Sequence, residues 1–251
     1  MKSLLWSSLL SVLVFFFFSG VKAEDYLSKA DALFEQGGME HYRQAIEWYI
    51  KALESNPADF ETNWKCARAY REYGEKAKRQ NVEGWKDICA RYGKEGMKYA
   101  QRASEKEPIR VEGHYYYGLN VGIYSDGVSI LTALAEGLKD KTKGSLEKAY
   151  ELDKTFRDGG PILALGRFWA IIPWPFKDKK KALNYYREYQ KTKVFVDKDE
   201  GKIYLADLLL ELGGEENVEE AKALLEVVLQ SEERYFSDWA KRLQERIEWK
   251  R

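Results

Sequence analysis

Histidine, cysteine, methionine and proline are scarce in this sequence. Among 251 residues there are two histidines, two cysteines, three methionines and five prolines. The two histidines, His41 and His114, do not form a pair with the spacing of a zinc site, so we expect no bound metal. The chain also lacks a phosphate-binding loop, a nucleophile elbow and a dinucleotide-binding fingerprint. These absences indicate a protein that is not an enzyme and that uses no cofactor.

An excess of charge of either sign is absent as well. Lys and Arg together number 41, as do Asp and Glu, so the formal net charge at pH 7 is zero. A nucleic-acid-binding protein needs a basic surface, and we therefore expect no nucleic-acid partner. The alternation of apolar and polar residues that is typical of strands is also missing. Because helix formers dominate and 14% of the residues are aromatic, the composition predicts an all-α fold.

The segment 42–60 contains the pattern that organises the rest of the chain. Ala45, Tyr49 and Ala52 stand at positions i, i+4 and i+7, so they share one face of a helix. Pro57 ends that helix because it has no N–H to donate, and Asp59 suits the N-cap of the next helix. This arrangement is similar to the second helix of a tetratricopeptide repeat (TPR).

Small residues recur in the same role at Ala67, Gly118, Gly166 and Ala221. The interval from Pro57 to Pro108 exceeds the TPR period of about 34 residues by roughly 17, so the repeats carry insertions. The apolar segment 122–137 is either an extra helix that lines a cavity or an addition to the core. Capping-box patterns at 197–200 and 217–220 predict two further helix starts.

These patterns predict stacked antiparallel helical hairpins, an irregular TPR-like α-solenoid. We expect residues 24–251 to form a single domain that ends in a C-terminal capping helix over 232–250.

The first 23 residues have the pattern of a Sec signal peptide. Lys2 precedes an apolar run over 4–18, and Val21 and Ala23 are small residues before a cleavage point at Glu24. The alternative is that the run stays in place as a membrane anchor. Cleavage would leave an exported chain without a membrane span, periplasmic in a Gram-negative source. Export permits a Cys66–Cys89 disulfide, and the alternative is two separate buried thiols.

The fourth repeat carries a more specific pattern. It reads D-G-G-P-x-x-A-L-G-R over 158–167, then a P-x-P turn at 173–175 and K-K-A-L-x-Y-Y over 180–186. This stretch resembles the T component of TPR-associated TRAP (tripartite ATP-independent periplasmic) transporters. The resemblance implies a periplasmic accessory protein whose partner is the transporter's substrate-binding subunit, and it allows a homo-oligomer. The sequence departs from lipoprotein members because it has no cysteine at the cleavage point.

Aromatic side chains and one arginine on the third and fourth repeats suggest a ligand groove. If their faces converge, the arginine can pair with the carboxylate of an apolar organic acid while the rings cover its apolar part. The alternative is that the rings only pack between helices and that the arginine meets Asp158 or Glu151. The candidate ligand-binding residues are His114, Tyr115, Tyr117, Arg167, Trp169 and Trp174.

Three functions therefore compete. The first is a TRAP-transporter accessory protein that binds the substrate-binding subunit and an organic acid. The second is a general periplasmic TPR adaptor that binds other proteins in its groove. The third is a self-assembling structural protein.

Overall fold

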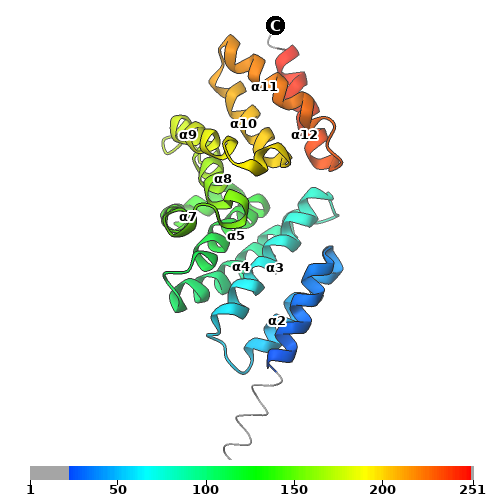
Figure 1. Cartoon of the computed structure of the whole chain (residues 1–251), viewed down its shortest axis with the longest axis vertical. Coiled ribbons are helices and arrows are strands. Elements are labelled where there is room, and N and C mark those ends of the chain that lie inside the picture. The colour runs from blue at the N-terminus through cyan, green and yellow to red at the C-terminus, as the bar shows by residue number, and fades with distance from the viewer. Residues whose placement is uncertain (1–22, 250–251) are drawn as a thin grey trace, which may run out of the picture. The chain divides into compact units, whose positions relative to one another are not determined.

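The computed structural model describes residues 23–249, and this part of the chain contains helices but no β-strand (Figure 1). It confirms the predicted fold class, an all-α structure of TPR-like helical hairpins. No helix in the described range is long and apolar enough to cross a bilayer. Residues 23–36 are helical, and the elements after them are α2 (Met39–Leu53), α3 (Phe60–Arg79), α4 (Trp85–Lys106), α5 (Val111–Val128), α6 (Ile130–Ala135), α7 (Leu138–Asp153), α8 (Phe156–Ile171), α9 (Lys179–Gln190), the 3-10 helix η1 (Lys193–Val196), α10 (Asp199–Leu212), α11 (Glu215–Val228) and α12 (Arg234–Glu248).

The chain divides into two compact units, residues 1–129 and 130–251. We refer to their described parts, 23–129 and 130–249, as the N-terminal and C-terminal units. The predicted signal peptide lies outside the described residues except for Ala23, which begins the first helix. A single domain over 24–251 stays a prediction.

In the N-terminal unit, the face that defines the repeat is buried as predicted. Ala45 and Tyr49 are fully buried and Ala52 is nearly so. The Tyr49 hydroxyl donates a 2.6 Å hydrogen bond to Asp31 on the preceding helix, so the one polar atom of this face is satisfied. Asp59 caps α3, because its carboxylate accepts a 2.8 Å hydrogen bond from the backbone N–H of Thr62.

The insertion in the second repeat lengthens two helices. α3 has 20 residues and α4 has 22, and only a short turn joins them. α4 then packs against α5 at backbone distance: a Cβ added at Gly93 would lie 2.4 Å from the Tyr124 nitrogen, and one at Gly127 would lie 2.3 Å from the Ala90 nitrogen. Glycine is therefore required at both crossings for reasons of space.

The apolar segment 122–137 is divided between elements. Its first half completes α5, and its second half forms the short helix α6. Within α6 only Ala133 is buried, and Leu131 is 68% exposed. The segment therefore adds little to the core after α5 ends.

In the C-terminal unit, successive helices pack against each other from α7 to α12. The core lies between α8 and α12 and includes the fully buried Ile203, Leu209 and Leu225. Gly166 of α8 lies against α9, where an added Cβ would be 2.5 Å from the ring of Tyr186. α12 covers the last hairpin with Phe236, Ala240 and Leu243, as a capping helix should.

α8 begins with a left-handed turn. Arg157, Asp158 and Gly159 have φ angles of 48°, 62° and 81°, and the right-handed part of the helix follows from Pro161 onward. Two of these three residues are not glycine, so the turn stores backbone strain that the surrounding packing must offset.

The two cysteines are separate buried thiols. The Cys89 thiol donates a hydrogen bond to the Gly74 carbonyl at 3.4 Å, which links α4 to α3. Burial raises the pKa of the Cys66 thiol well above its ordinary value and that of Cys89 to about 12. Of the two alternatives that the sequence left open, the disulfide is therefore wrong.

Candidate functional site

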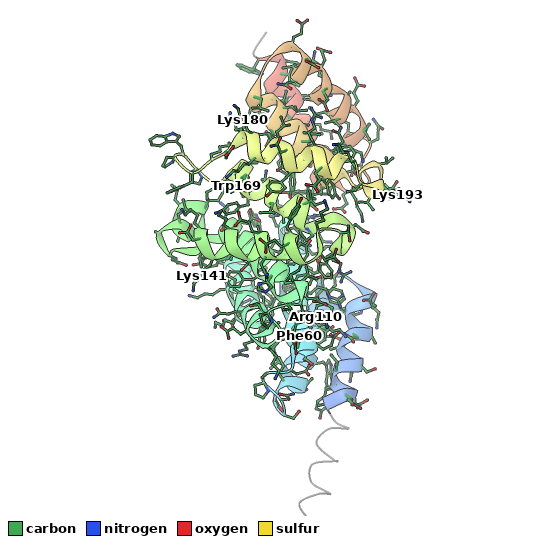
Figure 2. All side chains as sticks on the ribbon, turned by 60° about the vertical axis from the view of Figure 1, so that its left-hand side comes forward. Phe60, Arg110, Lys141, Trp169, Lys180 and Lys193 are labelled. Carbon is green, nitrogen blue, oxygen red and sulfur yellow. The ribbon has the colours of Figure 1, made fainter. Side chains whose placement is uncertain are left out.

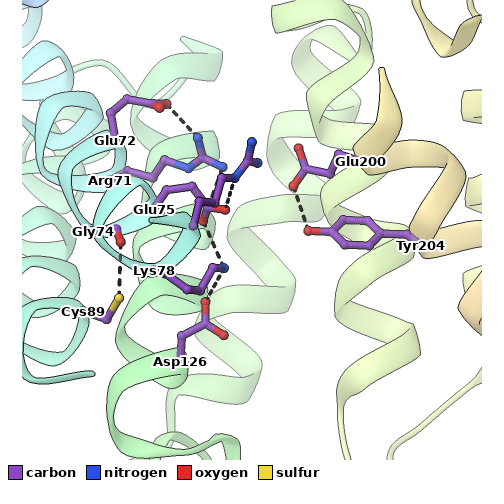
Figure 3. A network of polar contacts seen from close by, with 10 residues as sticks. Arg71, Glu72, Gly74, Glu75, Lys78, Cys89, Asp126, Glu200 and Tyr204 are labelled. Atoms are coloured by element: carbon purple, nitrogen blue, oxygen red, sulfur yellow. Dashed lines mark hydrogen bonds and ion pairs between the residues drawn. The ribbon is translucent and has the colours of Figure 1, made fainter. Parts of the chain in front are cut away.

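A cluster of charged side chains joins α3 to α5 in the N-terminal unit (Figure 3). At its centre Glu75 is 7% exposed and lies 2.7 Å from Arg79 and 3.1 Å from Lys78. Lys78 also forms a 2.8 Å ion pair with Asp126 on α5. Burial alone raises the pKa of Glu75, but the cations Lys78, Arg71 and Arg79 together lower it well below its usual range. Glu72, which pairs with Arg71 at 2.7 Å, brings the cluster to three cations and three carboxylates, and we interpret it as a structural contact.

A second cluster in the N-terminal unit combines cations with aromatic rings and is partly buried. The guanidinium of Arg68 lies 3.8 Å from the centre of the Phe34 ring and 5.2 Å from that of Trp64. Trp64 stacks on Tyr116 of α5 with a centroid distance of 6.0 Å. Lys65 beside it pairs with Asp31 at 2.7 Å. These contacts join three helices that come from three repeats.

Three of the predicted ligand-binding residues lie on α5. The Nε2 atom of His114 is 3.0 Å from the carbonyl oxygen of Pro108, at the turn before the helix. Tyr115 and Tyr117 are buried, and burial raises the pKa of Tyr117. Tyr115 packs edge-on against Tyr116 at a centroid distance of 5.2 Å. In this unit the two tyrosines serve helix packing, and His114 closes the preceding turn.

Arg167 lies at a cavity of about 250 Å³ between α8 and α10 in the C-terminal unit. Its guanidinium is 4.5 Å from the centre of the Tyr204 ring and 5.4 Å from that of Trp239. Tyr204 is oriented in turn by its hydroxyl, which donates to Glu200 at 2.7 Å (Figure 3). The cavity is lined by Arg167, Ala170, Ile171, Lys177, Tyr204, Asp207, Leu208 and Glu211.

The two carboxylates of this cavity are neutralised by cations. Asp207 accepts a 2.9 Å hydrogen bond from Arg246 of α12. Glu211 lies 2.6 Å from Lys177 in the loop between α8 and α9. The planar guanidinium of Arg167 is held at this cavity by the aromatic rings.

The two predicted tryptophans do not line this cavity. Trp169 has Lys181 over its ring at 4.4 Å, on the side of α8 that faces α9. Trp174 lies in the loop between α8 and α9 and is 87% exposed. Figure 2 shows Trp169 and Lys180 on the two helices that this loop connects. The structure therefore separates Arg167 from both tryptophans, and a groove formed by all six predicted residues stays a prediction.

Sequence reasoning missed the residues that surround Arg167. Tyr204 and Asp207 directly follow Ile203 and Ala206, which the periodic pattern places in the core, and Trp239 belongs to the last helix. The only sequence feature that could have indicated these residues is that they are polar or aromatic and stand next to the buried apolar positions of the helix. Among residues 23–249, no three His, Cys, Asp or Glu side chains gather in a way that could hold a metal ion.

Comparison with known proteins gives a consistent result. The family model "Regulator of microtubule dynamics protein 1-3" matches residues 26–169. Regulator of microtubule dynamics protein 1 of Mus musculus is 31% identical over 159 residues, which are 61% of this chain and 47% of that protein. The protein of the same name from Pongo abelii is 29% identical over 184 residues, 66% of this chain and 53% of that protein. The chain thus spans about half the length of the curated relatives it matches.

A solved structure shows the same fold. A thermophilic TPR protein of Thermus thermophilus superposes with a TM-score of 0.57 and 17% identity, over 89% of this chain and 97% of that chain. At this identity the likeness concerns the fold alone.

These comparisons overturn the transporter interpretation. The matched relatives are mammalian regulators of microtubule dynamics, and mammals have neither a periplasm nor a TRAP transporter. The predicted substrate-binding-subunit partner, the periplasmic location and the signal peptide that would direct export there are therefore wrong. The periplasmic location of the alternative adaptor is wrong for the same reason. The homo-oligomer was supported only by the transporter resemblance, and that support is removed.

The structure gives a physical reason for the misleading pattern over 158–167. Its residues form the left-handed turn and then the tight crossing of Gly166 with Tyr186. Helix packing of this kind requires small residues whatever the protein does.

Proposed function

The chain belongs to the family of Regulator of microtubule dynamics protein 1-3, and from this premise we propose that it is a non-enzymatic protein-interaction scaffold that influences microtubule dynamics. The observation that carries the proposal is the family match over 26–169, which includes nearly all of the described N-terminal unit and extends into α8. The TPR-like fold supports a protein partner, because stacked hairpins present extended surfaces for binding.

The test uses the full chain and purified tubulin. Microtubules growing from stabilised seeds are imaged with and without the chain, and their growth rate and frequency of shrinkage are measured. We expect at least one of these quantities to change in a concentration-dependent way. Unchanged dynamics, both with tubulin alone and in a cell extract that contains other microtubule-associated proteins, would contradict the proposal.

Within this function we propose Arg167 as the contact for a carboxylate of the protein partner. Support comes from its stacking on Tyr204 and Trp239, which fixes the plane of the guanidinium at the cavity. Replacing Arg167 with Gln removes the charge and the planar donor pair. We therefore expect Arg167→Gln to reduce the effect of the chain on microtubule growth.

Arg234→Gln is the matched control, because the Arg234 side chain is 91% exposed and forms only a surface pair with Asp238. Melting temperatures of both variants separate a lost contact from a lost fold. An Arg167→Gln variant that melts normally and acts like the unaltered chain would refute this role.

A further inference from the structure

The loop between α8 and α9 carries the exposed aromatic tip of the C-terminal unit. It runs from Ile172 to Asp178 and reads I-P-W-P-F-K-D. Two large aromatic side chains in this loop are exposed: Trp174 is 87% exposed and Phe176, two residues later, is 44% exposed. Large apolar side chains that gather on a surface in this way commonly mark a site of interaction.

Both ends of the loop are held in place. Ile172 is buried, and the backbone N–H of Asp178 donates to the Trp169 carbonyl at 3.3 Å. The Asp178 carboxylate then caps α9 by accepting from the backbone N–H of Lys181 at 3.0 Å. Inside the loop, the Phe176 N–H donates to the Pro173 carbonyl at 3.0 Å. The tip is thus presented by a fixed turn, with little conformational entropy left to lose on binding.

Lysines surround this tip. Residues 139–143 and 177–181 contain seven lysines and two aspartates. Four of these lysines form ion pairs with Asp140, Glu147 or Glu211, namely Lys139, Lys143, Lys177 and Lys179. Lys139 of α7 lies 4.1 Å from the centre of the Phe176 ring, so the start of α7 adjoins the loop. Within the described part of the chain, Lys141, Lys180 and Lys181 have no ion-pair partner, and Lys180 and Lys181 are exposed (Figure 2 labels Lys141 and Lys180). The surface therefore combines an apolar tip with excess positive charge.

We propose that this tip docks on an anionic lipid bilayer, with Trp174 and Phe176 among the headgroups and with Lys180 and Lys181 facing lipid phosphates. Trp favours the membrane–water interface because its ring is apolar and its N–H is polar. Lysines beside such a tip are attracted to anionic lipids. An acidic peptide would pair with the lysines but leave the projecting rings in water, whereas a bilayer covers both. Peripheral docking of this kind is independent of any effect on microtubules.

The buried cysteines make a site-specific test practical. Cys66 and Cys89 are fully buried, so a thiol-reactive NBD fluorophore attaches to a cysteine introduced at the surface. The full chain is labelled either as Trp174→Cys or as Trp249→Cys. Trp249 is the matched control, because it is 91% exposed and follows the last residue of α12, outside the loop.

Each labelled chain is titrated with phosphatidylcholine vesicles that contain or lack phosphatidylserine. We expect NBD at position 174 to shift to the blue, and to be quenched by brominated lipid, with the anionic vesicles. NBD at position 249 should show neither change. In the Trp174→Cys chain, Lys180→Gln should weaken vesicle binding about fivefold, the contribution of one basic residue near an anionic surface. The exposed Lys198→Gln should leave binding unchanged.

Three results would overturn the proposal. The first is no response at position 174 to either kind of vesicle. The second is an equal response at positions 174 and 249, which would mean that another part of the chain brings the whole molecule to the bilayer. The third is a response at 174 to polyglutamate but not to vesicles, which would assign the surface to an acidic protein. None of these assays contains tubulin, so they succeed or fail separately from the proposed function.

Discussion

At the scale of single residues, Glu75 shows how one buried charge depends on its neighbours. Its carboxylate lies within ion-pair distance of Arg71, Lys78 and Arg79, all on the same helix. The cluster continues through Lys78 to Asp126 on α5. Removing a charge from such a buried group leaves its partners incompletely paired in a poorly solvated place.

We therefore expect Glu75→Gln to lower the free energy of unfolding by about 3 kcal/mol, measured by urea denaturation at pH 7. Glu72→Gln is the control, because Glu72 pairs with Arg71 at a more exposed position and should cost at most about 1 kcal/mol. Equal losses in the two variants would mean that the buried cluster contributes no more than a surface ion pair.

The same residue predicts a dependence of stability on pH. The folded-state pKa of Glu75 is lowered, so its contribution is complete above the unfolded-state pKa of about 4.3 and is lost as the pH falls below that value. Between pH 7 and pH 3 the Glu75→Gln variant should thus lose less stability than the unaltered chain. Parallel stability curves for the two chains would contradict this assignment.

At the scale of elements, local signals predicted helix starts unevenly. Asp59 caps α3 as its sequence position suggests. The two predicted capping boxes are wrong, because α10 begins after Lys198 and α11 after Gly214, neither with a side-chain cap. At α11 the Gly213-Gly214 turn has already set the start of the helix, and Asn217 donates back to the Gly213 carbonyl at 2.7 Å. A capping pattern therefore competes with neighbouring turn residues for the start of a helix. Here the glycine turn, and not the capping pattern, determines where α11 begins.

The crossing of α8 and α9 leads to a prediction about packing. Gly166→Leu should lower the free energy of unfolding by about 1–3 kcal/mol or more, because the new side chain must displace the buried Tyr186 ring. Gly144→Leu on α7 is the control: nothing lies within 4 Å of an added Cβ there, and leucine favours a helix over glycine. Thermal and urea unfolding measure both variants, and a normal melting temperature for Gly166→Leu would exclude a close crossing at this point.

At the scale of the whole molecule, the fold was far more predictable than the function. The spacing of Ala45, Tyr49 and Ala52 depends only on helix geometry and predicts the buried face of α2. The function prediction rested instead on the stretch over 158–167, where the residue types serve a turn and a helix crossing. A packing motif recurs in proteins with unrelated roles, so it could not identify a transporter.

The candidate site was predictable only in part. Arg167 was identified from the sequence, but its contacts with Tyr204 and Trp239 join residues far apart in the chain. Trp169 and Trp174 were also identified from the sequence, which grouped them with Arg167 in one groove. The structure turns Trp169 toward Lys181 and leaves Trp174 in an exposed loop.

The sequence by itself determined the all-α class, the identity of the repeat and the close contact at Gly166, because these follow from helical periodicity and from residue size. Only the tertiary structure decided that the insertion lengthens α3 and α4, that Cys66 and Cys89 stay apart, and which side chains surround Arg167. These outcomes depend on how helices distant in the sequence cross, and the crossing is set by the combined packing of many side chains. The same packing buries Tyr186 and leaves Trp174 exposed, although both are aromatic residues of one repeat.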